Sequence, residues 1–244
     1  MIDLLCLPCA GASATMYMRW RRLVPSWLSL VPIELPGRGA RSDEAFATDF
    51  DALVGQISRE IMGGRHRQGA RPYALFGHSM GGLLSYGVAQ RLRLLGAPLP
   101  RYLFVSGSPA PSRRDAKRFT DKVGDEALIA DLRAHGGTPE EVFENPELLR
   151  ITLDTLAADY RVCASYSHRA LPPLPVPVHA CGGRDDDISV DDLLAWGDAT
   201  SAGFSLEWFT GGHFFIRQHE RSLLQGVAAQ LARTNETRLV HDAV

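Results

Sequence analysis

The stretch Tyr73-Ala-Leu-Phe-Gly-His-Ser79-Met-Gly-Gly-Leu83 joins a short apolar run, the pattern Gly-x-Ser-x-Gly and the first residue of a helical stretch. The apolar run predicts a strand that ends at Gly77, and residues 83–95 carry apolar side chains at helical spacing. A serine at such a sharp strand-to-helix turn is held in a strained backbone conformation, with its hydroxyl lifted above the sheet. We therefore predict that Ser79 is a nucleophile, and that side chains in place of Gly77 or Gly81 would collide with neighbouring backbone.

A serine hydroxyl is a weak nucleophile and needs a base, most often a histidine. Gly211-Gly212-His213 follows the apolar run at residues 206–209, and its glycines allow the loop to turn sharply toward the serine. We therefore predict that His213 is the base. The other histidines are weaker candidates for the base. His78 lies in the serine motif itself, and His66, His135 and His168 lie in polar or inserted segments. His179 lies inside a predicted strand, His219 just past the loop, and His241 near the chain end.

An acidic residue should orient the imidazole and stabilise its protonated form. The segment Gly182-Gly183-Arg184-Asp185-Asp186-Asp187 follows the apolar run at residues 176–181 and offers three aspartates. The spacing Gly-x-x-Asp selects Asp186 when it is counted from Gly183, and Asp185 when it is counted from Gly182. We favour Asp186, and expect the others to be solvated or to cap the helix predicted near residues 190–199.

Two backbone N–H groups are expected to stabilise the oxyanion of a tetrahedral intermediate. One is the N–H of Met80, directly after the nucleophile, and the other should come from the loop after an earlier strand. The small residues of Pro8-Cys9-Ala10-Gly11-Ala12 permit such a close approach, and we predict Ala10 as the second donor, with Cys9 as the alternative. The competing interpretation of this segment is an ordinary tight turn.

Short apolar runs bounded by Gly and Pro alternate with helical stretches along most of the chain, a pattern typical of an α/β fold with a mostly parallel sheet flanked by helices. The rhythm breaks between Pro109 and Leu174, where the pattern predicts a helical insertion that serves as a lid. Within it, Thr138-Pro-Glu-Glu141 resembles a helix start with Thr138 as N-cap. We thus predict one domain over residues 1–244 with a lid at about residues 109–174.

Composition excludes several classes of function. The 244 residues carry 26 Lys and Arg against 28 Asp and Glu, and a net charge of −2 does not suit nucleic-acid binding. Neither Lys117 nor Lys122 follows a glycine, and Gly37-Arg-Gly39 lacks the third glycine of a dinucleotide fingerprint, so nucleotide-binding loops have no support. No apolar run reaches the roughly 18 residues that span a bilayer, and no basic N-terminal signal is present. We expect a cytoplasmic protein without a membrane partner.

The four cysteines do not form the pattern of a disulfide framework or a zinc site, and we expect no metal or diffusible cofactor. Cys6-Leu-Pro-Cys9 has the spacing of a redox motif, which would require a thiol of low pKa. The alternative is that both are small apolar residues at a strand end, and we favour it.

Five segments together resemble the type II (editing) thioesterases that accompany polyketide synthases and nonribosomal peptide synthetases. They are Leu7–Ser13, which is similar to that family's first loop, Leu35-Pro-Gly-Arg-Gly39, which is similar to its second loop, and the serine, aspartate and histidine segments at residues 77–82, 182–186 and 211–214. Two positions depart from the family pattern, because Ala12 replaces a usual glycine and Asp187 stands where proline is common. The resemblance spans residues 4 to about 230.

The resemblance implies an α/β-hydrolase fold with a helical lid, and hydrolysis of acyl groups from the phosphopantetheine arm of acyl or peptidyl carrier proteins. It implies the roles of Ser79, Asp186 and His213 by motif position. The basic cluster Arg113, Arg114, Lys117 and Arg118 is a candidate docking face for an acidic carrier protein. We expect a monomer.

Two alternatives stay open at this stage. One is a carboxylesterase that acts on small oxygen esters, because a Ser-His-Asp triad does not distinguish oxygen esters from thioesters. The other is a non-catalytic binding protein on a hydrolase scaffold, although a binding protein has no need of all three triad residues.

Overall fold

The computed structural model describes residues 1–64, 71–122 and 124–241, with side chains described up to residue 233. Its centre is one sheet in the strand order β2-β1-β3-β4-β5-β6, and every neighbouring pair is parallel. The strands are β1 (Ile2–Leu7), β2 (Leu28–Pro32), β3 (Tyr73–His78), β4 (Leu103–Ser106), β5 (Val178–Gly183) and β6 (Phe204–Phe209). Strands β3, β5 and β6 overlap the apolar runs predicted near residues 73–77, 176–181 and 206–209. The predicted α/β fold with a parallel sheet is confirmed.

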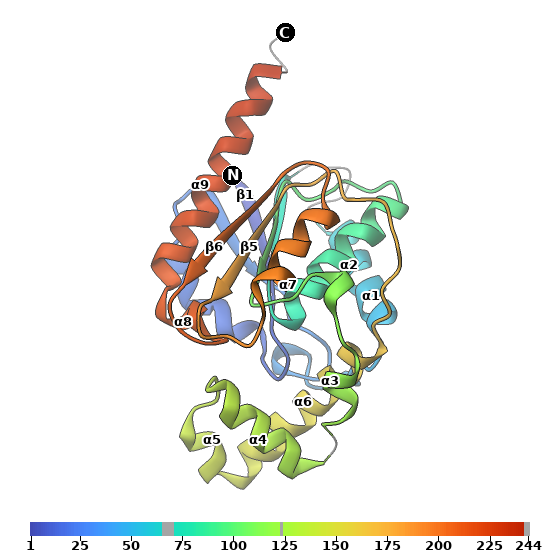
Figure 1. Cartoon of the computed structure of the whole chain (residues 1–244), viewed down its shortest axis with the longest axis vertical. Helices are drawn as coiled ribbons and strands as arrows, with labels where there is room; N and C mark the ends of the chain where they lie inside the picture. The colour runs from blue at the N-terminus through green and yellow to red at the C-terminus, as the bar shows by residue number, and fades with distance from the viewer. Residues whose placement is uncertain (65–70, 123, 242–244) are drawn as a thin grey trace.

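Helices cover both faces of the sheet, which explains why its strands are apolar throughout rather than alternating. On one face, Leu5 and Leu7 of β1 pack in one hydrophobic cluster with α1 (Phe50–Gly63) and α2 (Met80–Leu94). On the other face, Leu4 and Cys6 pack with the 3-10 helix η1 (Ala14–Arg22) and with α9 (Glu220–His241). Figure 1 shows α1 and α2 on the side opposite α9. Each fully buried leucine adds roughly 1.5–3 kcal/mol to this packing.

The insertion, residues 109–174, is helical. It contains a 3-10 turn at Pro111–Arg113, α3 (Lys117–Thr120), α4 (Asp125–His135), α5 (Glu140–Glu144) and α6 (Pro146–Ser165). Asn145 starts α6 by accepting hydrogen bonds from the N–H groups of Glu147 and Leu148. Figure 1 shows α4, α5 and α6 as a separate group beyond the ends of the strands. Helices α4 and α6 share a small hydrophobic cluster of Leu128, Leu153, Leu156 and Tyr160.

The predicted helix start at Thr138 is wrong. Helix α5 begins at Glu140, Pro139 is its N-cap in an extended conformation, and no side chain caps it. Packing against a distant loop decides the path of the chain here. A Cβ atom on Gly137 would overlap the ring of Phe214, so the segment before Pro139 follows that ring rather than a capping geometry.

The strand order places the functional loops together. Strands β1 and β3 are neighbours, while β2 and β4 lie on opposite outer sides of this pair. The strand order therefore reverses between β1 and β3, and the loops that leave their carboxyl ends border one crevice, which is where parallel α/β sheets bind ligands.

Candidate active site

Ser79 occupies a strained turn between β3 and α2. Its φ of 54° and ψ of −113° make it the one residue other than glycine with positive φ in the described part of the chain. A Cβ atom on Gly77 would overlap the backbone of Gly81, and one on Gly81 would overlap the carbonyl oxygen of Leu7. The strained serine and the need for both glycines, predicted from the sequence, are confirmed. A hydrogen bond of 2.8 Å from the Ser79 N–H to the Ser106 carbonyl anchors the turn on the neighbouring strand.

The structure pairs His213 with Asp186. His213 Nδ1 lies 2.9 Å from Asp186 Oδ2, and the two side chains are 11% and 3% exposed. Asp185 is exposed and accepts a hydrogen bond of 3.1 Å from the N–H of Gly211. Of the two aspartates that the spacing left open, Asp186 is therefore the partner of the imidazole, while Asp185 holds the loop that carries it.

The electrostatics of this pair determine its protonation. Burial alone would raise the pKa of Asp186, but the hydrogen bond and charge of His213 outweigh burial and lower the pKa to about 2. The carboxylate is therefore ionised at neutral pH and accepts the Nδ1 proton of His213. This fixes the imidazole tautomer, because Nε2 is then the nitrogen with a free lone pair.

A second imidazole lies behind His213 and stays neutral. The His78 ring lies 5.0 Å from the His213 ring, and its Nδ1 is 3.1 Å from Ser106 Oγ. Burial lowers the pKa of His78 well below its usual value, and His213 reinforces the effect. At neutral pH, His78 therefore adds no positive charge beside the His213 ring.

The predicted oxyanion donors are positioned next to the nucleophile. Ala10, Met80 and Ser79 line the same cavity. Across residues 1–64, 71–122 and 124–241, no hydrogen bond engages the N–H of Ala10 or of Met80. Both donors are therefore available to a ligand, and Cys9, the alternative to Ala10, lines the cavity beside them.

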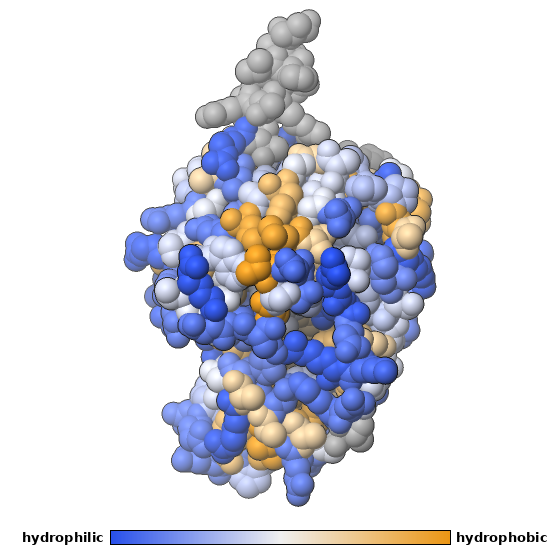
Figure 2. Space-filling view, viewed as in Figure 1, coloured by the Kyte–Doolittle hydropathy of each residue, from blue (hydrophilic) through white to orange (hydrophobic). Residues whose placement is uncertain are grey.

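A cavity of about 690 Å³ lies between this edge of the sheet and the insertion. Apolar side chains of the insertion form part of its wall, among them Phe119, Leu132, Val142 and Leu156. Figure 2 shows hydrophilic residues along the boundary between the insertion and the rest of the molecule, with apolar surface gathered mainly over α7 (Val190–Leu194). The volume lies in the range of sites that bind small molecules.

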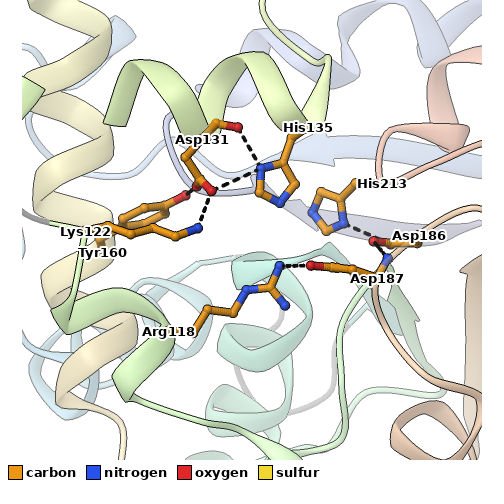
Figure 3. Close-up of polar contacts among 8 residues, drawn as sticks. All are labelled: Arg118, Lys122, Asp131, His135, Tyr160, Asp186, Asp187 and His213. Atoms are coloured by element: carbon orange, nitrogen blue, oxygen red, sulfur yellow. Dashed lines mark hydrogen bonds and ion pairs between the residues drawn. The ribbon is translucent and has the colours of Figure 1, made fainter. Parts of the chain in front are cut away.

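The sequence interpretation missed a polar cluster in the insertion that faces the site. Asp131 accepts hydrogen bonds from Lys122 and from the hydroxyl of Tyr160, and lies 3.6 Å from His135 Nδ1. The His135 ring lies 5.0 Å from the ring of His213, as Figure 3 illustrates. The i, i+4 spacing of Asp131 and His135 on one helix was the available signal. Only the fold brings that helix face over His213.

The four residues of the basic cluster do not share one exposed surface. Arg114 donates hydrogen bonds to the Ser79 carbonyl at 3.2 Å and to Ser108 Oγ at 2.8 Å, and it lines the cavity. Arg118 is paired with Asp187, which was expected to be solvated or to cap the helix near residues 190–199, and Ser189 is the N-cap of that helix. Arg113 and Lys117 are exposed. Arg114 therefore supports the serine turn, and docking of an acidic partner stays a prediction for the exposed Arg113 and Lys117.

The redox interpretation of Cys6 and Cys9 is contradicted. All four cysteines are buried and free, and burial raises the pKa of Cys9 to about 12 and that of Cys6 well above its usual value. Such thiols are poor nucleophiles at neutral pH. His66 lies outside the described residues, as does the side chain of His241.

Two further observations concern only the described residues. None of the described helices combines the length and apolarity needed to cross a bilayer. No group of three or more His, Cys, Asp or Glu side chains is placed to hold a metal ion in the described part of the chain.

A parallel sheet, a strained serine between strand and helix, and an Asp–His pair on the following loops define the α/β-hydrolase fold. A family model described as "Thioesterase domain" matches residues 3–232. The chain belongs to the thioesterase family. It is an enzyme that hydrolyses thioesters, which excludes the alternative of a non-catalytic scaffold.

Individual relatives agree with this assignment. The RedJ thioesterase of the prodiginine pathway in Streptomyces coelicolor is 33% identical, with a TM-score of 0.86 over 93% of this chain and 89% of its own. The type II thioesterase BorB of the borrelidin biosynthetic cluster is 37% identical, with a TM-score of 0.84 over 94% of this chain and 92% of its own. The predicted resemblance to type II thioesterases is confirmed.

A curated relative carries a different name. The linear gramicidin dehydrogenase LgrE of Brevibacillus parabrevis is 34% identical over 226 residues, which cover 91% of this chain and 84% of the relative. The present chain has no Gly-x-Gly-x-x-Gly segment at Gly37-Arg-Gly39, where its sequence comes nearest to a dinucleotide fingerprint. The family model and the serine site therefore decide the assignment for this chain.

Proposed function

We propose that this thioesterase releases acyl groups from the phosphopantetheine arm of carrier proteins in polyketide or nonribosomal peptide biosynthesis, and so clears stalled or mis-primed units. The observation that carries the proposal is the cavity at the serine turn, which Ser79, His213 and the predicted oxyanion donors line together. The similarity to BorB, described as a type II thioesterase of a biosynthetic cluster, supports the substrate class.

In the proposed acylation step, Ser79 Oγ attacks the thioester carbonyl carbon while His213 Nε2 accepts the hydroxyl proton. The ionised carboxylate of Asp186 stabilises the resulting imidazolium through the Nδ1 hydrogen bond of 2.9 Å. The carbonyl oxygen becomes an oxyanion that accepts hydrogen bonds from the N–H groups of Met80 and Ala10. Each such donor contributes about 3–4 kcal/mol to stabilisation of the transition state.

The tetrahedral intermediate then collapses. The carbon–sulfur bond breaks, the thiolate of the pantetheine arm takes the proton from His213, and the acyl group remains as an ester on Ser79. A water molecule gives a proton to His213 Nε2 and attacks the ester carbonyl. The carboxylic acid is released and Ser79 regains its proton. All the side chains in this scheme come from one chain, so we expect a monomer to be active.

The insertion, in this proposal, is a lid over the acyl group. Phe119, Leu132 and Leu156 supply apolar surface that faces the cavity. Contact of the acyl chain with this surface would exclude water from the ester until the carrier arm has left. The lid thereby limits the size of the acyl group, while the chemistry stays at the edge of the sheet.

The decisive experiment compares acid release from an acetylated carrier protein by the wild type and by Ser79→Ala. The expected result is release by the wild type alone, with a fluorophosphonate adduct on Ser79 of the wild type. A matched pair of small substrates, acetyl-pantetheine and its oxygen-ester analogue, tests the carboxylesterase alternative. Preference for the free oxygen ester over the carrier-bound thioester would overturn the proposal.

A further inference from the structure

A buried ion pair joins the insertion to the second loop of the sheet edge. Arg38, in the loop after β2, donates from Nη1 and Nη2 to the two carboxylate oxygens of Asp159 on α6, both at 2.6 Å. The side chains are 5% and 1% exposed. This forked geometry is the strongest form of an arginine–carboxylate contact. The Arg38–Asp159 ion pair takes no direct part in the proposed reaction.

Both members of the pair also hold the backbone of the loop at residues 9–13. Asp159 Oδ2 accepts a hydrogen bond of 2.8 Å from the N–H of Gly11, and Arg38 Nη1 donates one of 3.0 Å to the carbonyl of Ala12. Gly11 has a φ of +76°, which a residue with a side chain rarely adopts. The peptide groups Ala10–Gly11 and Ala12–Ser13 are therefore held by Asp159 and Arg38, respectively.

The other side of the same loop is fixed by the core. The hydroxyl of Tyr17 donates to the carbonyl of Leu7 at 2.8 Å, and the backbone of Leu7 and Pro8 lies directly against Gly81. Ala10 is thus held between an anchor on the core and a clamp from Arg38 and Asp159. Its own N–H has no partner in the described part of the chain and borders the cavity beside Ser79.

Burying two charges at this place is expensive, and apolar residues of similar size would often give equal or greater stability. Burial raises the pKa of Asp159 even though Arg38 and the Gly11 N–H oppose it. The pair therefore has a use other than cohesion. A donor N–H in an oxyanion hole must be held to within about 0.5 Å of its productive position.

We propose that Arg38 and Asp159 are positioning residues that orient the loop at residues 9–13, so that the Ala10 N–H points at the oxyanion formed on Ser79. The inference rests on the nucleophile and oxyanion assignments of the proposed function. Because Asp159 belongs to α6, the oxyanion donor is in place only while the insertion is seated on the sheet edge. The pair thereby makes acylation depend on closure of the insertion.

The test measures labelling of Ser79 by a fluorophosphonate, whose phosphoryl oxygen occupies the oxyanion site, in the full-length protein. The variants are Asp159→Asn and Arg38→Lys, and the matched control is Arg150→Gln, which removes exposed ion pairs from the same helix. We expect both variants to lower the maximal labelling rate by roughly 100-fold. We expect probe affinity and the pH profile of labelling to stay unchanged, since the His213–Asp186 pair is not touched. Arg150→Gln should label as the wild type does.

Two variants are used so that a loss of labelling caused by misfolding can be distinguished from a loss of positioning. Arg38→Lys keeps a positive charge beside Asp159 and so avoids an unpaired buried carboxylate, but one ammonium does not reproduce the contacts to both carboxylate oxygens and to Ala12. Wild-type labelling by a folded Arg38→Lys protein would overturn the inference, as would an equal loss in Arg150→Gln. If the wild type is labelled at Ser79 but does not unload an acyl carrier protein, the proposed function fails while the positioning role stands.

Discussion

Two surfaces face each other across the cavity. At the sheet edge, Ser79 and the Ala10 loop are shaped mainly by backbone, through a strained φ, glycines without room for a side chain and unengaged N–H groups. The insertion acts through side chains, chiefly the clusters around Asp131 and Asp159. In the proposed function, the sheet edge therefore defines which bond is attacked. The insertion would define the size and polarity of the acyl site and, through Asp159, hold the loop that carries the Ala10 donor.

Substitutions at the sheet edge and in the insertion should affect different properties of the enzyme. Changes at the sheet edge should lower the rate of the chemical step and leave substrate affinity intact. Changes in the insertion should alter stability and affinity, with the Asp159 clamp as the exception because it reaches the sheet edge.

The largest effect is expected for Ser79→Ala. Removal of the nucleophile should lower kcat for an acetylated carrier protein by about 10⁴- to 10⁶-fold, since no other group in the scheme forms the acyl-enzyme. Binding of the carrier protein, measured by calorimetry, should stay within about threefold of the wild type. Substantial residual turnover by Ser79→Ala would contradict the assignment of the chemical step to the sheet edge.

Asp186→Asn should be nearly as severe. Loss of the carboxylate favours the wrong imidazole tautomer and is expected to lower kcat by about 10³- to 10⁴-fold. Asp185→Asn is the matched control, because its carboxylate bonds the Gly211 N–H and not the imidazole, and it should cost less than about tenfold. Equal losses in the two variants would contradict the pairing of His213 with Asp186.

Gly81→Ala tests whether backbone packing shapes the sheet edge. The new Cβ would overlap the Leu7 carbonyl, so we expect the free energy of unfolding to fall by at least about 3 kcal/mol. Gly96→Ala is the control, because Gly96 has a φ of +62° but no neighbouring atom near its Cβ position. Only backbone strain of about 1–2 kcal/mol is expected there. Denaturant unfolding measures both values, and similar losses would argue against a packing constraint at the serine turn.

Lys122→Met tests the insertion. Burial raises the pKa of Asp131, but the hydrogen bonds from Lys122 and Tyr160 outweigh burial, and the net pKa is lowered. Because the pKa of Asp131 is lower in the folded state than in the unfolded state, its ionised carboxylate stabilises the fold at pH values above the unfolded-state pKa, near 4. This contribution is lost as the pH falls through the folded-state pKa. We expect a loss of about 1–2 kcal/mol at pH 7 that shrinks below about pH 4. A loss that is independent of pH would contradict the assigned charge contact.

The smallest effect concerns the exposed remainder of the basic cluster. Arg113→Glu combined with Lys117→Glu should lower kcat/KM for a carrier-bound substrate by about three- to tenfold at low salt. The effect should vanish near 0.5 M salt, because the Debye length is then only about 4 Å. Hydrolysis of acetyl-pantetheine serves as the control and should not change. An unchanged rate with the carrier-bound substrate would remove these residues from the docking surface.

Sequence patterns predicted the sheet edge well because its geometry depends on the backbone. Gly77 is necessary because a Cβ atom there would overlap the backbone of Gly81 within the same turn, whereas Gly81 is necessary because the Leu7 carbonyl of the neighbouring strand lies against it. The Gly-x-Ser-x-Gly pattern records both positions, although only the first constraint is local. The choice between Asp185 and Asp186 stayed open because the Gly-x-x-Asp spacing can be counted from either Gly182 or Gly183. Spacing alone does not show which of the two side chains reaches the imidazole. The Gly211 N–H and the His213 ring separate the two aspartates only once the loops are folded.

The sequence by itself determined the parallel sheet, the serine turn, the order of the Ser, Asp and His segments and the helical character of the insertion, because each depends on periodicity or on local steric limits. The tertiary structure alone decided that Arg38 reaches Asp159, that Arg114 supports the serine turn and that His135 lies on His213. These contacts join residues far apart in the chain, and their partners are chosen by how the insertion packs on the sheet edge. No local pattern records that choice.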